Sequence, residues 1–135
     1  MSRSRSVCVY ALIFLAGGLA YCVMELIYRG RSHPSMFIAG GLSLVFLYII
    51  AAKSRVPAWK KWIIGGAVIT TIEFITGAVV NIALGLNVWD YSGMAMNFMG
   101  QISLSFSLLW VLLSIPSVWL LERLDNRLAK RRDRA

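Results

Sequence analysis

Residues 73–101 read EFITGAVVNIALGLNVWDYSGMAMNFMGQ, and this stretch decides how the rest of the chain is interpreted. It opens with Glu73, which lies about midway along an otherwise apolar run, roughly residues 62–86. A run of that length is enough for a membrane-spanning helix, which needs about 20 residues. A carboxylate at that depth is costly, so it predicts a functional or pairing site. The connection that follows is rich in Asn, Asp, Tyr, Trp and Met, and it holds no Lys or Arg.

The composition predicts an integral membrane protein. Of the 135 residues, 59% are hydrophobic, where soluble proteins have about half, and the mean hydropathy is +0.70. The polar residues gather at the termini and in short connections between four apolar runs, at about 7–28, 36–52, 62–86 and 101–121. We therefore expect an all-α integral membrane protein, a bundle of four transmembrane helices forming a single domain over 1–135. A short basic amphipathic helix should follow over about 122–135, resting on the membrane or docking to a partner.

The net charge of +8 is placed in a way that favours a membrane orientation over nucleic-acid binding. Of the fourteen basic residues, all but Arg29 and Arg31 lie at the two termini or between the second and third spans. The positive-inside rule then predicts a multi-pass protein of the cell membrane with both termini in the cytoplasm. Cys8 and Cys22 would lie about 21 Å apart along one helix, too far for a disulfide. With a single His, the sequence predicts no metal site and no cofactor.

A stripe of small and polar residues follows one face of the third span. Its members recur at steps of four, three, four and four: Gly66, Thr70, Glu73, Gly77 and Asn81. In lipid such a stripe faces neighbouring helices, because glycine allows close approach and polar groups need partners. The pattern allows two interpretations of Glu73, a buried pairing residue or a group that handles a ligand or a proton.

Two other features of the sequence, a possible ion pair and the connection after the third span, each allow two interpretations. Glu25 and Arg29 are spaced to pair on one helix, either as an ion pair at the end of the span or as groups that reach the polar interior. The connection up to Gly100 either dips back into the bundle or simply turns at Asp90, which is followed by Ser92 and Gly93.

Three pieces of the sequence together resemble a known family. They are ELIYRG from residue 25, EFITG-x3-N from residue 73, and WDYS-x4-NF-x-GQISL from residue 89. The chain is similar over about 7–121 to the putative ABC-transporter type IV (CmpB-like) family of small bacterial membrane proteins. The resemblance implies a permease role, with any ATPase supplied by a partner. A fainter similarity points to small membrane subunits of lycopene-type cyclases, but Gln101 and Ser103 stand where those proteins have paired acids.

These observations lead to one main hypothesis and two alternatives. The main hypothesis is a transporter-type subunit that binds a small or lipid-like solute in an outward-facing polar pocket around Glu73. The alternatives are an intramembrane enzyme for an isoprenoid or lipid, with Glu73 and Asp90 as acid and base, and a non-catalytic adaptor. Expected partners are membrane lipids and either further copies of the chain or a partner membrane subunit or ATPase. The candidate ligand-binding residues are Glu25, Arg29, Glu73, Asn81, Trp89, Asp90, Tyr91, Asn97 and Gln101.

Overall fold

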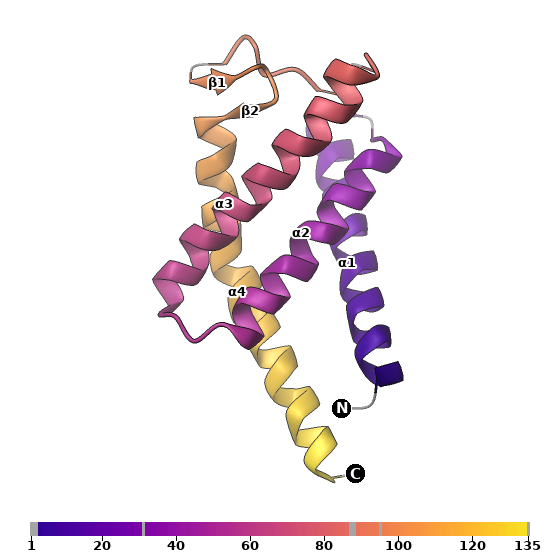
Figure 1. Cartoon of the computed structure of the whole chain (residues 1–135), viewed down its shortest axis with the longest axis vertical. Coiled ribbons are helices and arrows are strands. Elements are labelled where there is room, and N and C mark those ends of the chain that lie inside the picture. The colour runs from indigo at the N-terminus through magenta and orange to yellow at the C-terminus, as the bar shows by residue number, and fades with distance from the viewer. Residues whose placement is uncertain (1–2, 31, 87–88, 95, 135) are drawn as a thin grey trace.

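Four long helices run alternately up and down in a computed structural model that describes residues 3–30, 32–86, 89–94 and 96–134. They are α1 (Arg3–Arg29), α2 (Pro34–Lys53), α3 (Ala58–Gly77) and α4 (Leu104–Arg134). Both termini lie at one end of the bundle, which we call the terminal end (Figure 1). The opposite end carries two short strands, β1 (Asn97–Phe98) and β2 (Ile102–Ser103), and we call it the hairpin end. Each of the four helical segments is long and apolar enough to cross a membrane, as the sequence predicted.

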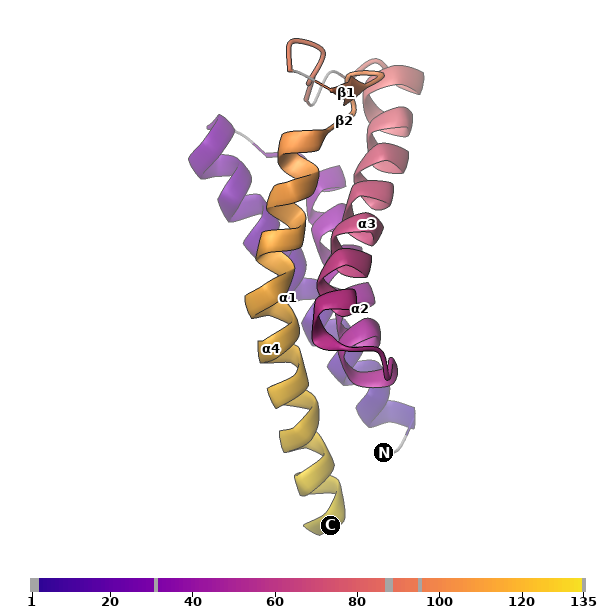
Figure 2. The same cartoon turned by 90° about the vertical axis from the view of Figure 1, so that its left-hand side faces the viewer.

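The helices pack as two close pairs. α1 lies against α2 and α3 lies against α4, while α2 also contacts both α3 and α4 (Figures 1 and 2). Glycines bring α1 and α2 together, since a Cβ added at Gly17 would lie 2.5 Å from the carbonyl oxygen of Gly40. The outer faces of all four helices expose large apolar side chains, which is the pattern expected of surfaces that meet lipid or other apolar helices.

Polar side chains hold the terminal end together. The Lys61 ammonium donates to the carbonyl oxygen of Ala51 at 2.8 Å and to the Glu122 carboxylate at 2.9 Å. The Tyr48 hydroxyl donates to Asp125 at 2.9 Å. These contacts join α2 and α3 to the part of α4 that follows the apolar run.

The third span ends differently from the simple helix that the sequence predicted over 62–86. Its last turns, Ala78–Ala83, form a π-helix, here η1. Gly85 follows with a φ of 64°, a left-handed conformation that commonly ends a helix. The extra residue of a π-turn cannot be read from apolar spacing, and such turns are frequent at functional sites.

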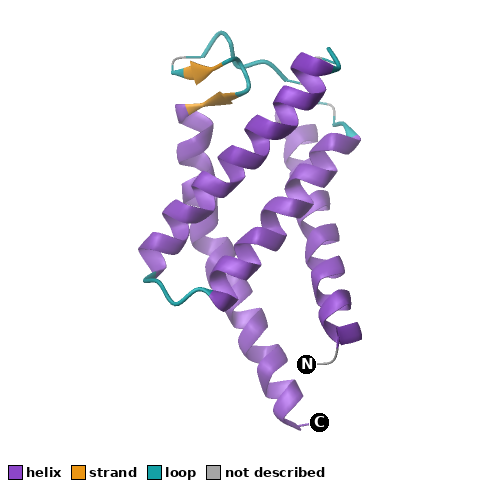
Figure 3. Ribbon diagram, in the orientation of Figure 1, coloured by secondary structure: helices purple, strands orange, loops and turns teal. Residues whose placement is uncertain are grey.

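The fourth span begins at Leu104, three residues later than predicted, because Gln101 lies in the antiparallel hairpin before it (Figure 3). With 31 residues, α4 is about 46 Å long at 1.5 Å per residue, which exceeds the roughly 30 Å of a hydrocarbon core. Its last turns project beyond the other helices (Figure 2). The basic tail is thus helical but continuous with the span, and a separate helix resting on the membrane stays a prediction.

Candidate functional site

As its spacing predicted, the polar stripe of the third span faces a neighbouring helix, here α4, and at its η1 end it also meets the hairpin. A Cβ added at Gly66 would clash with Val111, and the Thr70 hydroxyl donates to Ser107 at 3.0 Å. At the hairpin end of the stripe, the Asn81 side-chain amide donates to Gln101 Oε1 at 2.8 Å. The polar groups of the stripe therefore find their partners inside the bundle.

Glu73, in the middle of this stripe, is buried with 4% of its surface exposed. Its Oε2 accepts a hydrogen bond of 2.6 Å from the indole N–H of Trp110 on α4. No described residue donates a hydrogen bond to the other carboxylate oxygen, Oε1. A buried polar atom with no partner is uncommon in proteins, because it loses the hydrogen bonds that water would supply. Among the described residues, this oxygen and Arg29 Nη1 are the two buried side-chain atoms without a hydrogen-bond partner, and both point to a ligand or proton site.

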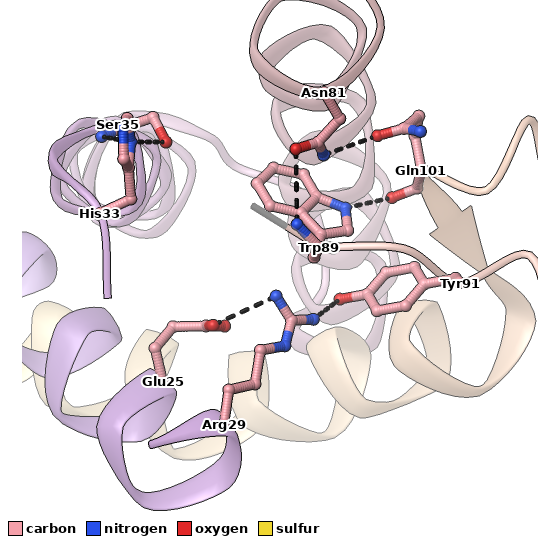
Figure 4. Close-up of polar contacts among 8 residues, drawn as sticks. All are labelled: Glu25, Arg29, His33, Ser35, Asn81, Trp89, Tyr91 and Gln101. Atoms are coloured by element: carbon pink, nitrogen blue, oxygen red, sulfur yellow. Dashed lines mark hydrogen bonds and ion pairs between the residues drawn. The ribbon is translucent and has the colours of Figure 1, made fainter. Parts of the chain in front are cut away.

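Three of the predicted residues, Glu25, Arg29 and Tyr91, form a second group of polar side chains (Figure 4). Arg29 Nη1 lies 3.2 Å from the Glu25 carboxylate, and Arg29 Nη2 donates to the Tyr91 hydroxyl at 2.8 Å. Both members of the ion pair are largely buried, and Arg29 reaches the connection between α3 and α4. Of the two interpretations of this pair, the structure favours the one in which Arg29 reaches the bundle interior.

The Tyr91 hydroxyl accepts a hydrogen bond from Arg29 and also lies near the Glu73 carboxylate. Burial, with the nearby Glu73 carboxylate as the next cause, raises the pKa of the Tyr91 hydroxyl well above its usual range. The hydroxyl therefore keeps its proton at neutral pH and remains able to donate a hydrogen bond. We call the four side chains of Glu25, Arg29, Glu73 and Tyr91 the carboxylate cluster.

Asn81, Trp89 and Gln101 form a separate network that fixes the connection to the end of α3 (Figure 4). The Trp89 indole N–H donates to the backbone carbonyl oxygen of Gln101 at 3.0 Å, and the Trp89 backbone N–H donates to Asn81 Oδ1 at 3.4 Å. Trp89 is buried, with 4% of its surface exposed. These hydrogen bonds hold Trp89, two residues before Tyr91, against η1 and the hairpin, and a ligand-binding role for the three residues stays a prediction.

Asp90 and Asn97 make hydrogen bonds within the turns of the connection. Asp90 is exposed, and its Oδ1 accepts a hydrogen bond from the Ser92 backbone N–H at 2.8 Å. That bond, and a further one from the Ser92 side chain, hold the pKa of Asp90 below its usual value. Asn97 donates to the Met94 carbonyl oxygen at 2.8 Å and accepts from the Gly100 N–H at 3.0 Å. The enzyme alternative needs Glu73 and Asp90 as an acid–base pair, and this arrangement gives it no support.

Next to the carboxylate cluster lies a groove of about 490 Å³ between α1 and α4. The volume falls within the roughly 300–1,000 Å³ of small-molecule sites. The groove is lined by Tyr21, Met24, Glu25, Tyr28, Met94, Ser105, Phe106, Leu109 and Trp110. A smaller cavity of about 110 Å³ shares Tyr21, Met24 and Trp110 with it and reaches the α2 residues Gly40 and Ser43.

Apart from Glu25, these lining residues were missed by sequence analysis. Most are apolar side chains on apolar helices, and nothing in their spacing separates a groove wall from a lipid-facing surface. Trp110 connects the groove to the cluster, because it lines the groove and also donates to Glu73. Its ring stacks on that of Tyr21, with 5.7 Å between the ring centres. The described residues hold no cluster of three or more His, Cys, Asp or Glu that could bind a metal ion.

The fold and the buried cluster together define a small four-span membrane protein with an ionisable group inside the bundle. Comparison with protein families gives a match over residues 6–134 to the family described as Putative ABC-transporter type IV. The chain belongs to this family, which confirms the resemblance carried by the three sequence pieces. Searches of curated proteins and of solved structures gave no match.

Proposed function

We propose that this chain is a transporter-type membrane subunit that binds a lipid-like solute in the groove between α1 and α4. The apolar part of the solute would lie along the groove, and its polar end would meet the carboxylate cluster. If α1 and α4 span the membrane, the open side of the groove would face the hydrocarbon and give such a solute a lateral entry. Membership of the family supports the general part of this proposal, a membrane protein of ABC-transporter type.

The observation that carries the proposal is the unpaired Oε1 of Glu73. A buried carboxylate that served only to hold helices together would be expected to have both oxygens paired. Here Oε2 accepts from Trp110 and the Tyr91 hydroxyl lies near the carboxylate, while Oε1, without a hydrogen bond from a described residue, would take a proton or a donor group of the solute. Trp110, which donates to Glu73, also lines the groove, and so does Glu25 of the cluster. The cluster and the groove therefore form one site.

Trp110 lines the groove and donates to Glu73, and its ring stacks on Tyr21, so contact between a solute and Glu73 would require these rings to move. Glu73 would bind a proton when the solute leaves and release it when the solute returns, in a cycle of alternating access. Asn81, Trp89 and Gln101 would hold the connection in place during this cycle.

Four helices enclose little space on their own, so we propose that the chain works with further copies or with a partner membrane subunit and an ATPase. The exposed apolar faces of the helices offer the surface for such contacts. The basic residues of the terminal end would lie on the cytoplasmic side of the cell membrane, with the hairpin end outside.

Native mass spectrometry of the purified protein, with two matched variants, tests this proposal. Leu109→Trp fills the groove, because Leu109 lines it, whereas Leu108→Trp adds the same volume on a neighbouring residue outside the lining. Both leucines are partly exposed, at 37% and 55%, so both variants should fold. We expect a discrete lipid-like mass on the wild type and on Leu108→Trp, and its loss from Leu109→Trp. Equal occupancy in both variants would contradict a solute site in the groove.

A further inference from the structure

The side chains of the groove and of the carboxylate cluster also indicate the charge of the solute. Resting on the proposed function, we infer that the solute is an amphipathic cation, an apolar chain or ring system that carries an ammonium-type positive charge.

The first argument comes from the groove walls, which are rich in aromatic rings. Tyr21, Tyr28, Phe106 and Trp110 supply four rings, and Met24 and Met94 supply polarisable thioethers. Cations bind favourably over the faces of Trp, Tyr and Phe rings within about 6 Å of the ring centre, and more strongly where water is excluded.

The same part of the molecule already holds one cation in this way. The guanidinium carbon of Arg29 lies 5.3 Å from the ring centre of Tyr91 and 5.9 Å from those of Tyr28 and Trp89. Tyr28 belongs to the groove lining as well. The ring faces at this end of the bundle are therefore positioned for positive charge.

The second argument is the balance of charge. Among the described residues that line the groove, Glu25 is the charged one. The carboxylate cluster contains two carboxylates, Glu25 and Glu73, against one guanidinium. When Glu73 gives up its proton the cluster carries a net negative charge, and a cation in the groove restores neutrality.

The third argument weighs against an anionic head group. The single cation of the cluster, Arg29, pairs with Glu25 at 3.2 Å, donates from Nη2 to the Tyr91 hydroxyl and lies over three aromatic rings, although its Nη1 has no hydrogen bond to a described residue. A phosphate or carboxylate that reached Nη1 would lie beside the Glu25 carboxylate. Such like-charge contact in a site with little water is unfavourable.

Three probes of equal chain length separate the possible head groups. Binding of dodecyltrimethylammonium, dodecanoate and dodecanol to the full chain in maltoside micelles would be followed by tryptophan fluorescence and calorimetry, with empty micelles subtracted. Trp110 in the groove wall supplies the optical signal. We expect the cation to bind at least about tenfold more tightly than dodecanoate, with dodecanol between them.

Variants of single carboxylates then identify which groups cause the preference for a cation. Glu25→Gln and Glu73→Gln should each weaken binding of the cation by about tenfold and leave dodecanol binding nearly unchanged. Asp90→Asn is the matched control, because it removes an exposed carboxylate of the neighbouring connection and should leave all three affinities unchanged. Leu109→Trp keeps every charge and should abolish binding of the cation, so the result does not depend on a Glu variant that fails to fold.

The outcomes distinguish this inference from the proposed function. If dodecanoate or dodecanol binds as tightly as the cation and Leu109→Trp abolishes that binding, the groove takes lipid-like solutes and the preference for a cation is wrong. If none of the probes responds to Leu109→Trp, and the co-purifying mass does not respond either, both the inference and the proposed function are wrong.

Discussion

At the scale of single residues, Trp110 connects three features of the molecule. Its indole N–H is the hydrogen-bond donor to Glu73, its ring stacks on Tyr21, and its side chain lines the groove. It is also buried, with 5% of its surface exposed. A substitution that keeps an aromatic ring but removes the N–H should therefore show how much the hydrogen bond to Glu73 contributes to stability.

We expect Trp110→Phe to lower the free energy of unfolding by about 1–3 kcal/mol, because it leaves both oxygens of a buried carboxyl group without a described donor. Thermal unfolding in detergent measures this change. Trp119→Phe, at a position with 54% of its surface exposed on the same helix, is the control and should stay within about 0.5 kcal/mol of wild type. Adding Glu73→Leu to Trp110→Phe should recover part of the loss, because both partners are then apolar. Simple additivity of the two single costs would contradict this account.

Gly77 allows the polar stripe of α3 to approach the connection. A Cβ at this position would lie 2.5 Å from Gln101 Oε1 and 2.9 Å from Trp89 Cζ2, both of them buried groups. Gly77→Ala should therefore destabilise the protein by about 1–3 kcal/mol through overpacking. Gly93→Ala is the matched control, because a Cβ there meets nothing within 4 Å. Equal unfolding temperatures for the two variants would show that the contact at Gly77 adjusts at no cost.

At the scale of elements, the connection between α3 and α4 behaves as a folded cap on the hairpin end. It is fastened at one side by η1, whose Asn81 bonds to Gln101, and at the other by the β1–β2 pair. Trp89 and Tyr91 both direct buried rings from it towards the bundle, where the Tyr91 ring stacks on Phe106 with 4.8 Å between ring centres. The position of Tyr91 in the carboxylate cluster thus depends on the hydrogen bonds that fasten this cap to η1 and the hairpin.

Trp89→Phe tests that dependence, since it removes the bond from the indole N–H to the Gln101 carbonyl oxygen and keeps an aromatic ring. We expect faster amide hydrogen exchange in residues 89–103 with little change in α1 and α2, because the cap opens as a local unit. Met96→Leu, at a position with 75% of its surface exposed in the same connection, should leave exchange nearly unchanged. Uniform acceleration along the whole chain would instead indicate global destabilisation.

At the scale of the whole molecule, the two ends of the bundle differ in their chemistry. The terminal end is tied by charged and hydroxyl groups from α2, α3 and α4, and basic residues such as Arg123 and Arg127 are exposed there. The carboxylate cluster lies towards the hairpin end, beside the groove between α1 and α4. Under the proposed function, the solute would enter near this end.

Cysteine labelling in cells tests the orientation that follows. In a background with Cys8→Ala and Cys22→Ala, we expect Gly93→Cys to react with a membrane-impermeant maleimide in intact cells. Asn126→Cys should react only after permeabilisation. Both positions are exposed, so access depends on the side of the membrane rather than on burial. The reverse pattern would place the hairpin end in the cytoplasm and overturn the proposed orientation.

The sequence by itself determined the membrane class, the four spans, the family and the face of α3 that carries Glu73. These features are local, since apolar length and a spacing of three or four residues depend only on neighbours along one helix. The residues Glu25, Arg29, Glu73 and Tyr91 could therefore be predicted as site residues, and the structure brings them together. That they bind a ligand stays a prediction.

Only the tertiary structure decided which of the polar candidates gather around Glu73 and which serve the turns, as Asp90 and Asn97 do. It alone supplied the π-helical end of α3, the Trp110 partner of Glu73 and the groove between α1 and α4. The physical reason is that a partner and a cavity arise where faces of distant segments meet, and apolar residues such as Leu109 have the same local pattern whether they line a groove or meet lipid.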